Sequence, residues 1–254
     1  MSGPGQAEGF ATPVQDWGEK TAARYDASTS DRASKEVLGP TVAFLAQLAG
    51  KGRALELAIG TGRVAIPLAA SGVEVAGIDL SEAMVRRLRQ KAGGEAVPVV
   101  VGDMTTTLVP GRFSLVYLVF NGLSNLTSQA EQVACFHNAA RHLDAGGRFV
   151  IELFVPALRR LPPGQSAVPF DVSEDHLGFD TYDTVSQLCA SHHYWREEDG
   201  TVGSSAGTFR YAWPAECDLM AALAGLSLES RFSGWEKEPF TAESESHVSV
   251  YAKP

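Results

Sequence analysis

The chain has 254 residues, 44% of them hydrophobic and 20% charged, and carries a formal net charge of −9. A chain of this composition can bury a sizeable core, so we expect an ordinary globular protein. The acidic balance argues against nucleic acid as a partner, because binding to a phosphate backbone depends on clustered Lys and Arg. The sequence shows no signal-peptide pattern and no apolar stretch long enough to cross a bilayer. We therefore expect a cytoplasmic protein that does not act at a membrane.

Three cysteines, Cys135, Cys189 and Cys217, lie far apart in the chain. They lack the close pairing that zinc sites and disulfide frameworks show. The sequence therefore predicts buried, reduced thiols and no metal site.

Helical periodicity over residues 21–33 and 38–48 predicts two helices near the N-terminus. Five short apolar runs follow and predict strands over residues 54–58, 73–78, 96–101, 113–120 and 148–154. Helix-length segments separate several of these runs, over residues 62–70, 82–91 and 129–143. Strands and helices that alternate in this way predict an α/β fold, a doubly wound parallel sheet with helices on both faces.

The pattern changes after residue 155. Strand-like runs over residues 167–172, 181–193 and 207–213 predict a small antiparallel cap inserted after the fifth strand. Pro214 suits the first turn of a helix over residues 216–224, and Gly225 suits the left-handed position that ends it. Runs over residues 227–235 and 247–252 then predict an antiparallel pair that brings the sheet to seven strands, most of them parallel.

We therefore expect four parts. An N-terminal helical lid takes residues 1–50, and a cofactor-binding core takes residues 51–155. The inserted antiparallel cap takes residues 156–213, and residues 214–254 form the C-terminal helix and strand pair that complete the core sheet.

The most informative stretch runs from the first predicted strand through Gly60 and Gly62 into a helix. Glycines let the backbone approach a ligand closely, and the N-terminus of the following helix attracts an anionic group. The spacing of Gly60, Gly62 and Ala65 also fits a dinucleotide-binding turn. The turn alone does not separate a nicotinamide-dependent enzyme from a methyltransferase.

Two further features follow the next strands. Asp79 ends the second predicted strand, where a carboxylate can accept hydrogen bonds from both hydroxyls of a ribose. Gly102, Asp103 and Met104 follow the third, where Asp103 can bind an adenine amino group and Met104 can pack on the ring. The alternative interpretation is structural: Asp79 caps the helix that begins near Ser81, and Met84 belongs to the core.

Together these motifs resemble class I S-adenosylmethionine-dependent methyltransferases, whose first motif is an acidic residue followed by three alternating glycines. Glu56, Ala58, Gly60 and Gly62 occupy these places, and Ala58 departs from the pattern at the first glycine. The resemblance covers roughly the first 155 residues and implies a Rossmann-like sheet with S-adenosylmethionine as the cofactor. It implies a cofactor site made of Tyr25, Glu56, Ala58, Gly60, Gly62, Arg63, Asp79, Leu80, Met84, Gly102, Asp103, Met104 and Phe120.

Methyl transfer from a sulfonium is an in-line displacement in which the enzyme mainly aligns the donor and acceptor and excludes water. The predicted positioning or proton-accepting residues are Tyr25, which resembles the lid tyrosine of small-molecule methyltransferases, Asn121 and His192. The predicted acceptor contacts are Trp17, Ser124, Tyr211, Trp213, Trp235 and His247. Alternation along a strand allows at most one of His192 and His193 to face the cleft. The structural alternative is that the aromatic residues belong to the core and that the histidines have only structural roles.

The cap and the closing stretch Arg210-Tyr211-Ala212-Trp213-Pro214 are similar to actinobacterial natural-product methyltransferases, including those that N-methylate lincosamide-type antibiotics and aminosugars. This resemblance implies a small-molecule acceptor, an amine nitrogen of an antibiotic or another natural product. No Asn-Pro-Pro-Tyr-type sequence follows the fourth strand; Phe120-Asn121-Gly122-Leu123 stands there.

Three alternatives stay open. O-methylation of a small molecule is one, since no motif decides between nitrogen and oxygen. A nicotinamide-dependent oxidoreductase is another, although no convincing catalytic set for it is found in the sequence. A non-catalytic module that binds S-adenosylmethionine is the third. The cap and the N-terminal helices also offer surfaces for a homo-oligomer.

Overall fold

The structure is a computed structural model that describes residues 17–28, 34–197 and 199–254. Two helices, α1 (Glu19–Ser28) and α2 (Lys35–Ala49), precede the first strand. Residues 29–33, the end of the first predicted helix, lie outside the described residues. None of the described helices combines the length and apolar character that a membrane-spanning helix needs.

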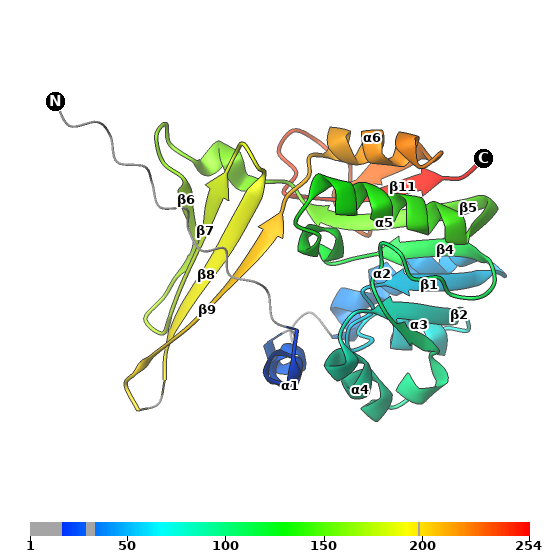
Figure 1. The fold of residues 1–254 in the computed structure, drawn as a ribbon, viewed down its shortest axis with the longest axis horizontal. Helices are drawn as coiled ribbons and strands as arrows, with labels where there is room; N and C mark the ends of the chain where they lie inside the picture. The colour runs from blue at the N-terminus through cyan, green and yellow to red at the C-terminus, as the bar shows by residue number, and fades with distance from the viewer. Residues whose placement is uncertain (1–16, 29–33, 198) are drawn as a thin grey trace.

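Seven strands form the main sheet, in the order β10-β11-β5-β4-β1-β2-β3 (Figure 1). β1 to β5 run parallel to one another, whereas β11 runs antiparallel to both β5 and β10. The strands are β1 (Arg53–Leu57), β2 (Glu74–Asp79), β3 (Val99–Val101), β4 (Phe113–Leu118), β5 (Leu143–Phe154), β10 (Ser227–Phe232) and β11 (Ser246–Ala252). The predicted doubly wound, mostly parallel sheet of seven strands is confirmed.

Helices cover both faces of this sheet because neighbouring residues of its strands point to opposite sides. Leu115 and Tyr117 of β4 pack on the face that α2 covers, whereas Val116 and Leu118 pack on the face that α5 and α6 cover. The covering helices are α2, α3 (Ala65–Ala70), α4 (Glu82–Gln90), α5 (Gln129–His142) and α6 (Pro214–Leu223). Both faces are buried, which explains why the sequence of the central strands is almost continuously apolar.

A second sheet has four antiparallel strands in the order β6-β7-β8-β9 and stands apart from the first at the left of Figure 1. Its strands are β6 (Ala167–Val172), β7 (His176–Asp183), β8 (Leu188–Arg196) and β9 (Val202–Arg210). The single strand predicted over residues 181–193 is wrong, because β7 ends at Asp183 and β8 begins at Leu188. The Asp183 carboxylate accepts hydrogen bonds from Val185 N and Ser186 Oγ, and this local turn separates the two strands.

The C-terminal predictions are confirmed. Pro214 lies in the first turn of α6, and Gly225 has a φ of 75° just after the helix. The division of the chain after residues 50, 155 and 213 stays a prediction.

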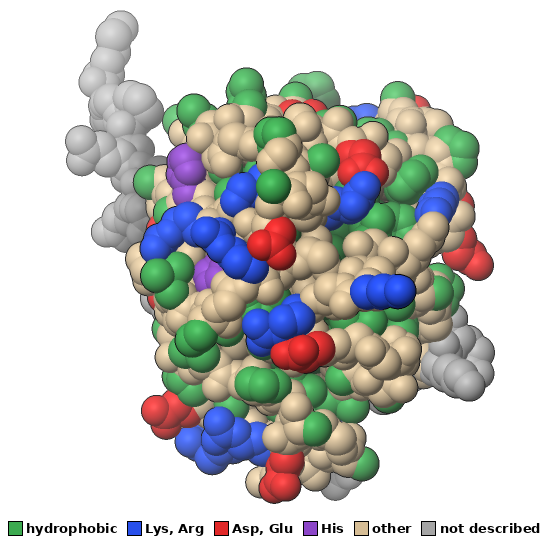
Figure 2. Space-filling model, turned by 90° about the vertical axis from the view of Figure 1, so that its right-hand side faces the viewer, with side chains coloured by type: hydrophobic (Ala, Val, Ile, Leu, Met, Phe, Trp, Pro, Cys, Tyr) green, Lys and Arg blue, Asp and Glu red, His purple; other side chains and the backbone are tan. Residues whose placement is uncertain are grey.

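The end of the molecule opposite the four-stranded sheet is shown in Figure 2, where basic and acidic side chains are interspersed with hydrophobic ones. On that face Lys and Arg do not gather into one patch of the kind that a phosphate backbone needs.

The parallel strands end at the edge of the main sheet that faces the four-stranded sheet, and sharp turns follow two of them. Ala58, after β1, has a φ of 52°, and Phe120 and Asn121, after β4, have φ values of 53° and 58°. This left-handed region is strained for residues with a Cβ atom. The φ of Ala58 explains why glycine is the usual residue at the first glycine place of the motif.

Replacing Ala58 with glycine should therefore stabilise the protein. We expect Ala58→Gly to raise the free energy of unfolding by about 0.5–1 kcal/mol, since relief of the left-handed strain exceeds the loss of one methyl group and the added chain entropy. Urea denaturation measures this change. The control is Ala54→Gly in β1, the strand that precedes this turn, where extended backbone suits alanine and the substitution should destabilise. A destabilised Ala58→Gly variant would contradict the strain argument.

Candidate active site

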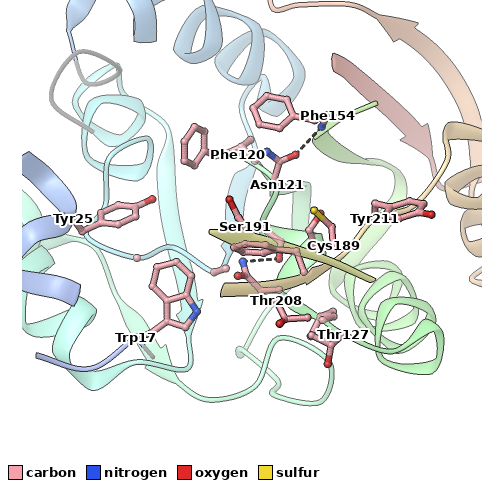
Figure 3. Close-up of a pocket in the computed structure, with 18 of the residues that line it drawn as sticks. Trp17, Tyr25, Phe120, Asn121, Thr127, Phe154, Cys189, Ser191, Thr208 and Tyr211 are labelled. Atoms are coloured by element: carbon pink, nitrogen blue, oxygen red, sulfur yellow. Dashed lines mark hydrogen bonds between the residues drawn. The ribbon is translucent and has the colours of Figure 1, made fainter. Parts of the chain in front are cut away.

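A cavity of about 1740 Å³ lies between the carboxyl edge of the main sheet and the four-stranded sheet. This volume exceeds the roughly 300–1000 Å³ of a site for one small molecule. Figure 3 shows Trp17 and Tyr25 at one side of the cavity and Cys189 and Tyr211 at the other. The cavity therefore has room for two ligands side by side.

The loop after β1 is held to the end of β2 by hydrogen bonds. Gly60 N donates to Asp79 Oδ2 over 2.6 Å, and Ser81 N donates to Asp79 Oδ1 over 2.8 Å. Asp79 is buried and lines the cavity. Burial raises the pKa of its carboxyl, and the two backbone hydrogen bonds oppose this rise. Each carboxylate oxygen keeps a second lone pair, so Asp79 can hold the loop and still accept hydrogen bonds from a ligand.

The helix-capping role that the alternative interpretation gives to Asp79 belongs to a nearby residue instead. Ser81 is the N-cap of α4, and its Oγ accepts a hydrogen bond from Met84 N. Met84 is 3% exposed and packs with Ala22, yet it also lines the cavity. Met84 is thus both a core residue and part of the cavity wall.

A buried acid, Glu56, lies at the floor of the cavity. The hydroxyl of Tyr117 donates to Glu56 Oε2 over 3.0 Å. Burial raises the pKa of Glu56 to about 8, although the hydrogen bond from Tyr117 and the charge of Arg63 lower it. The Arg63 guanidinium also stacks over the Phe120 ring, 4.4 Å from its centre. Glu56 is therefore neutral at pH 7 in spite of Arg63, and a second cation beside it would favour its ionised form.

Helix α1 closes one side of the cavity. Burial raises the pKa of the Tyr25 hydroxyl, on which the charges of Arg63, Glu56 and Asp79 also act, so the side chain lies among the predicted cofactor residues. Trp17 packs edge-on against Tyr25 with ring centres 6.2 Å apart. Both aromatic rings line the cavity, as the sequence predicts.

A small polar cluster ties α1 to the glycine-containing loop. Lys91 Nζ lies 2.8 Å from Asp26 Oδ1 and 2.9 Å from Thr61 Oγ1, and Thr61 Oγ1 donates to Asp26 Oδ1 over 2.7 Å. Burial alone would raise the pKa of Asp26, but the hydrogen bonds from Lys91 and Thr61 lower it. The cluster joins the lid helix to two elements of the core.

The strained turn after β4 is held by Glu152 of β5. Phe120 N donates to Glu152 Oε2 over 2.8 Å, and Trp235 Nε1 donates to Glu152 Oε1 over 2.7 Å. Asn121 Oδ1 accepts a hydrogen bond of 2.7 Å from Phe154 N, drawn in Figure 3. These contacts hold the backbone of Phe120 and Asn121 at the cavity despite the strain of its left-handed conformation.

Most predicted site residues meet at this cavity. Its lining includes Trp17, Tyr25, Glu56, Ala58, Gly60, Arg63, Asp79, Leu80, Met84, Asp103, Met104, Phe120, Asn121, Ser124 and Tyr211. Gly62 and Gly102 do not line it. Gly62 packs against Leu88, and Gly102 packs against Thr107, so each glycine makes room for a neighbouring side chain.

Four predicted acceptor-side residues do not line the cavity. His192 points to the other side of its strand and stacks on Phe179, with ring centres 4.8 Å apart. Trp213 is 39% exposed, and His247 is fully buried beside Ser249. Trp235 packs on Phe44 and holds Glu152. The structure thus corrects two expectations: Trp213, Trp235 and His247, predicted as acceptor contacts, and His192, predicted as a positioning or proton-accepting residue, lie outside the cavity lining.

Several cavity residues come from strands whose inner face the sequence did not reveal. They are Phe170, Asp180, Tyr182, Ser191 and His193. Asp180 and Tyr182 lie two residues apart in β7, and Ser191 and His193 lie two apart in β8, so each pair shares one side of its strand. This period-two signal was hidden because β7 and β8 were predicted as one strand. The part of the chain that the structure describes holds no group of three His, Cys, Asp or Glu that could bind a metal.

Known proteins share both the core and the whole architecture. A family model described as a methyltransferase domain matches residues 54–147. The structure of the CcbJ methyltransferase from Streptomyces caelestis superposes with a TM-score of 0.82 at 36% sequence identity, covering 93% of this chain and 98% of that one. The chain belongs to the class I S-adenosylmethionine-dependent methyltransferases.

Two other relatives of this methyltransferase come from actinobacteria. A cypemycin N-terminal methyltransferase from Streptomyces is 28% identical over 193 residues, which cover 75% of this chain and 78% of the relative. The fold also matches S-adenosylmethionine-bound CalS10, an amino pentose methyltransferase from Micromonospora echinaspora, with a TM-score of 0.72 at 21% identity over 91% of this chain and 96% of that one. The methyltransferase is of the natural-product type, and its cofactor is S-adenosylmethionine.

We expect the polar cluster of Asp26, Lys91 and Thr61, which holds α1 to the core, to contribute to affinity for the cofactor. Asp26→Asn removes the ion pair with Lys91. The side chain of Asp26 is 42% exposed and that of Lys91 is 33% exposed. Solvent screening limits such a pair to about 1 kcal/mol, so the Kd for S-adenosylmethionine should rise roughly fivefold. Calorimetric titration measures it. Glu74→Gln, which breaks the Arg53–Glu74 pair at the far end of β2, is the control. Equal Kd values for the wild-type protein and Asp26→Asn would show that the polar cluster does not support binding of S-adenosylmethionine.

The methyltransferase should also release a proton when it binds its cofactor. Glu56 is protonated at pH 7 because its folded-state pKa is about 8. If Glu56 belongs to the cofactor site, as the resemblance implies, the α-ammonium of a cofactor bound beside it would favour the ionised form. We expect release of up to about one proton at pH 7 and none near pH 9.5, where the carboxyl is already ionised.

Titration calorimetry in buffers of different ionisation enthalpy counts these protons. The Glu56→Gln variant should release none at either pH. A binding enthalpy that does not vary with the buffer for the wild-type protein at pH 7 would contradict the assignment of Glu56.

Proposed function

We propose that this methyltransferase transfers the methyl group of S-adenosylmethionine to an amine nitrogen of a small natural product, such as an aminosugar or a lincosamide-like molecule. The observation that carries this proposal is the carboxylate of Asp180, which faces the cavity from β7, on the side opposite to the lid. Aromatic side chains of Phe170, Tyr182 and Tyr211 line the same side. A carboxylate among aromatic rings attracts an organic ammonium group.

The cofactor side of the cavity fits S-adenosylmethionine on the chemistry of its side chains. Asp79 would accept the ribose hydroxyls, Asp103 would accept the adenine amino group, and Glu56 would face the ammonium of the methionine part. Asp103 Oδ1 already accepts hydrogen bonds from Thr105 N and Thr105 Oγ1, which orient its carboxylate. When bound, the cofactor supplies a methyl group on a positively charged sulfur.

The chain's own residues would align the acceptor and exclude water. Tyr25 of α1 and Trp17 just before this helix would close over the cofactor. Asn121, held by Phe154 N, would fix the side of the site where the methyl group lies. Alignment of this kind supplies most of the rate enhancement when the donor is already activated. Ser124 and Tyr211 line the acceptor side.

The names of two relatives support a nitrogen acceptor. One is a cypemycin N-terminal methyltransferase, and the other is an amino pentose methyltransferase. These names describe those proteins, and the carboxylate of Asp180 is the feature of this chain that agrees with them. Cytoplasmic location and homo-oligomer formation remain predictions.

A paired-acceptor assay tests the proposal. Sugars of one skeleton that carry either an amino group or a hydroxyl at the same carbon are incubated with S-adenosylmethionine, and mass spectrometry detects the methylated product. We expect methylation of the amines, and Asp180→Asn should raise the KM for a cationic acceptor by roughly tenfold or more, because about 1.4 kcal/mol corresponds to a factor of ten.

Asp175→Asn is the matched control, because Asp175 is exposed in the turn before β7 and does not line the cavity. Methylation of the hydroxyl partner alone would overturn the nitrogen assignment in favour of O-methylation. Binding of S-adenosylmethionine without transfer to any acceptor would point to a binding module.

A further inference from the structure

A row of polar side chains crosses the four-stranded sheet from the cavity to its outer edge. Asp180 of β7 and Ser191 of β8 are directly paired across the two strands, and His193 pairs with Gly178 on the same side. Asp180, Ser191 and His193 line the cavity. His176, farther along β7, and Asp171, on the edge strand β6, do not line it.

Hydrogen bonds join these five side chains without a gap. Ser191 Oγ lies 3.3 Å from His193 Nε2, and its hydroxyl also bonds the Asp180 carboxyl. His193 Nδ1 lies 3.1 Å from His176 Nε2, and His176 Nδ1 lies 2.6 Å from Asp171 Oδ2. The side chains of His176 and Asp171 are 29% and 46% exposed. This row of hydrogen-bonded side chains thus starts inside the cavity and ends at a carboxylate in contact with solvent.

Packing holds the two imidazoles in line. Their ring centres are 5.3 Å apart with an angle of 28° between the planes, and the Phe170 ring lies 5.3 Å from the ring of His193. Gly178 provides the space, since a Cβ atom there would lie 2.2 Å from the Phe170 ring and 3.0 Å from His176. The glycine and the aromatic ring keep the nitrogen atoms of both histidines facing each other.

We propose that Asp180, Ser191, His193, His176 and Asp171 form a relay that carries the acceptor's proton out of the cavity to solvent. This inference rests on the proposed transfer to an amine. Formation of the N–C bond breaks the S–C bond of the sulfonium, and the electron pair of that bond stays on sulfur. The acceptor ammonium must lose one proton so that its nitrogen lone pair is free to attack.

The proton passes along the relay in balanced steps. The ammonium gives its proton to the Asp180 carboxylate, which passes it to Ser191 Oγ as the Ser191 hydroxyl gives its own proton to His193 Nε2. His193 then gives its Nδ1 proton to His176 Nε2, and His176 gives its Nδ1 proton to Asp171 and water. Each group gains one proton and loses one, and the imidazoles regain their first tautomer by exchange with water at the exposed end.

The electrostatic surroundings suit this path. Burial raises the pKa of Asp180, so its carboxyl can hold a proton that a fully solvated one would lose. Burial and the neighbouring His176 lower the pKa of His193, whereas Asp180 raises it and His192 lowers it further. The other titratable groups on the same side of these strands are Asp171, Tyr182 and Cys189. His193 is therefore neutral near pH 7 and free to accept a proton at Nε2.

The deciding variant is His176→Asn, because it cuts the relay at a residue outside the cavity. We expect kcat at pH values below the pKa of the acceptor amine to fall by roughly a hundredfold, within the range of proton-transfer contributions. The loss should disappear above that pKa, where the amine arrives unprotonated, and the Kd for S-adenosylmethionine should not change. His192→Asn, next to His193 but on the other side of the strand, is the control and should keep the wild-type pH profile.

A wild-type pH profile in His176→Asn, or a loss that persists at high pH, would overturn the relay. If the wild-type protein methylates no amine, the proposed function fails and nuclear magnetic resonance of ¹⁵N-labelled histidine decides the relay alone. The relay requires His193 and His176 both to carry their proton on Nδ1 near pH 8, and His176→Asn to shift the titration of His193. A proton on Nε2 of either ring, or an unchanged His193 titration, would refute it.

Discussion

Two carboxylates, one buried and one half-buried, hold the turns at the carboxyl edge of the main sheet, and the cavity depends on them. Asp79 accepts the backbone N–H groups of Gly60 and Ser81, and Glu152 accepts that of Phe120. A turn that approaches a ligand leaves N–H groups without the partners that a strand or helix provides, and burying such a group unpaired is costly. The carboxylates meet this need from neighbouring strands, so the loops keep their shape before a ligand arrives.

Acidic side chains in the cavity serve recognition as well as loop structure. Glu56, Asp79 and Asp103 line the part assigned to the cofactor, and Asp180 lines the part assigned to the acceptor. Both proposed ligands are cations in water, because one carries a sulfonium and the other an ammonium. In a site shielded from solvent these carboxylates act more strongly than they would at the surface. The acidic balance of the whole chain agrees with such ligands and disfavours polyanions.

The four-stranded sheet supplies one side of the cavity, proposed to bind the acceptor, through simple alternation of its side chains. Cys189, Ser191 and His193 of β8 line the cavity, whereas His192 points away from it and stacks on Phe179. One position along a strand thus separates a residue that can reach the acceptor from one that supports the outer face. The same rule aligns His176 with Asp180 on the inner side of β7, which makes a continuous polar row across the sheet possible.

The sequence by itself determined the doubly wound sheet, the positions of most strands and most of the cofactor side. These features follow from local patterns: apolar runs that alternate with helices, and Gly60, Asp79 and Asp103 placed directly after successive strands. Only the tertiary structure brought Asp180, Ser191 and His193 to the cavity, because the four-stranded sheet that carries them lies opposite the edge of the main sheet only in the folded chain. The sequence pattern also did not decide whether Trp235 and His247 contact the acceptor or belong to the core. Aromatic residues at period two look alike whether they face a core or a ligand, and only the packing of Trp235 on Phe44 and the burial of His247 separate the two cases.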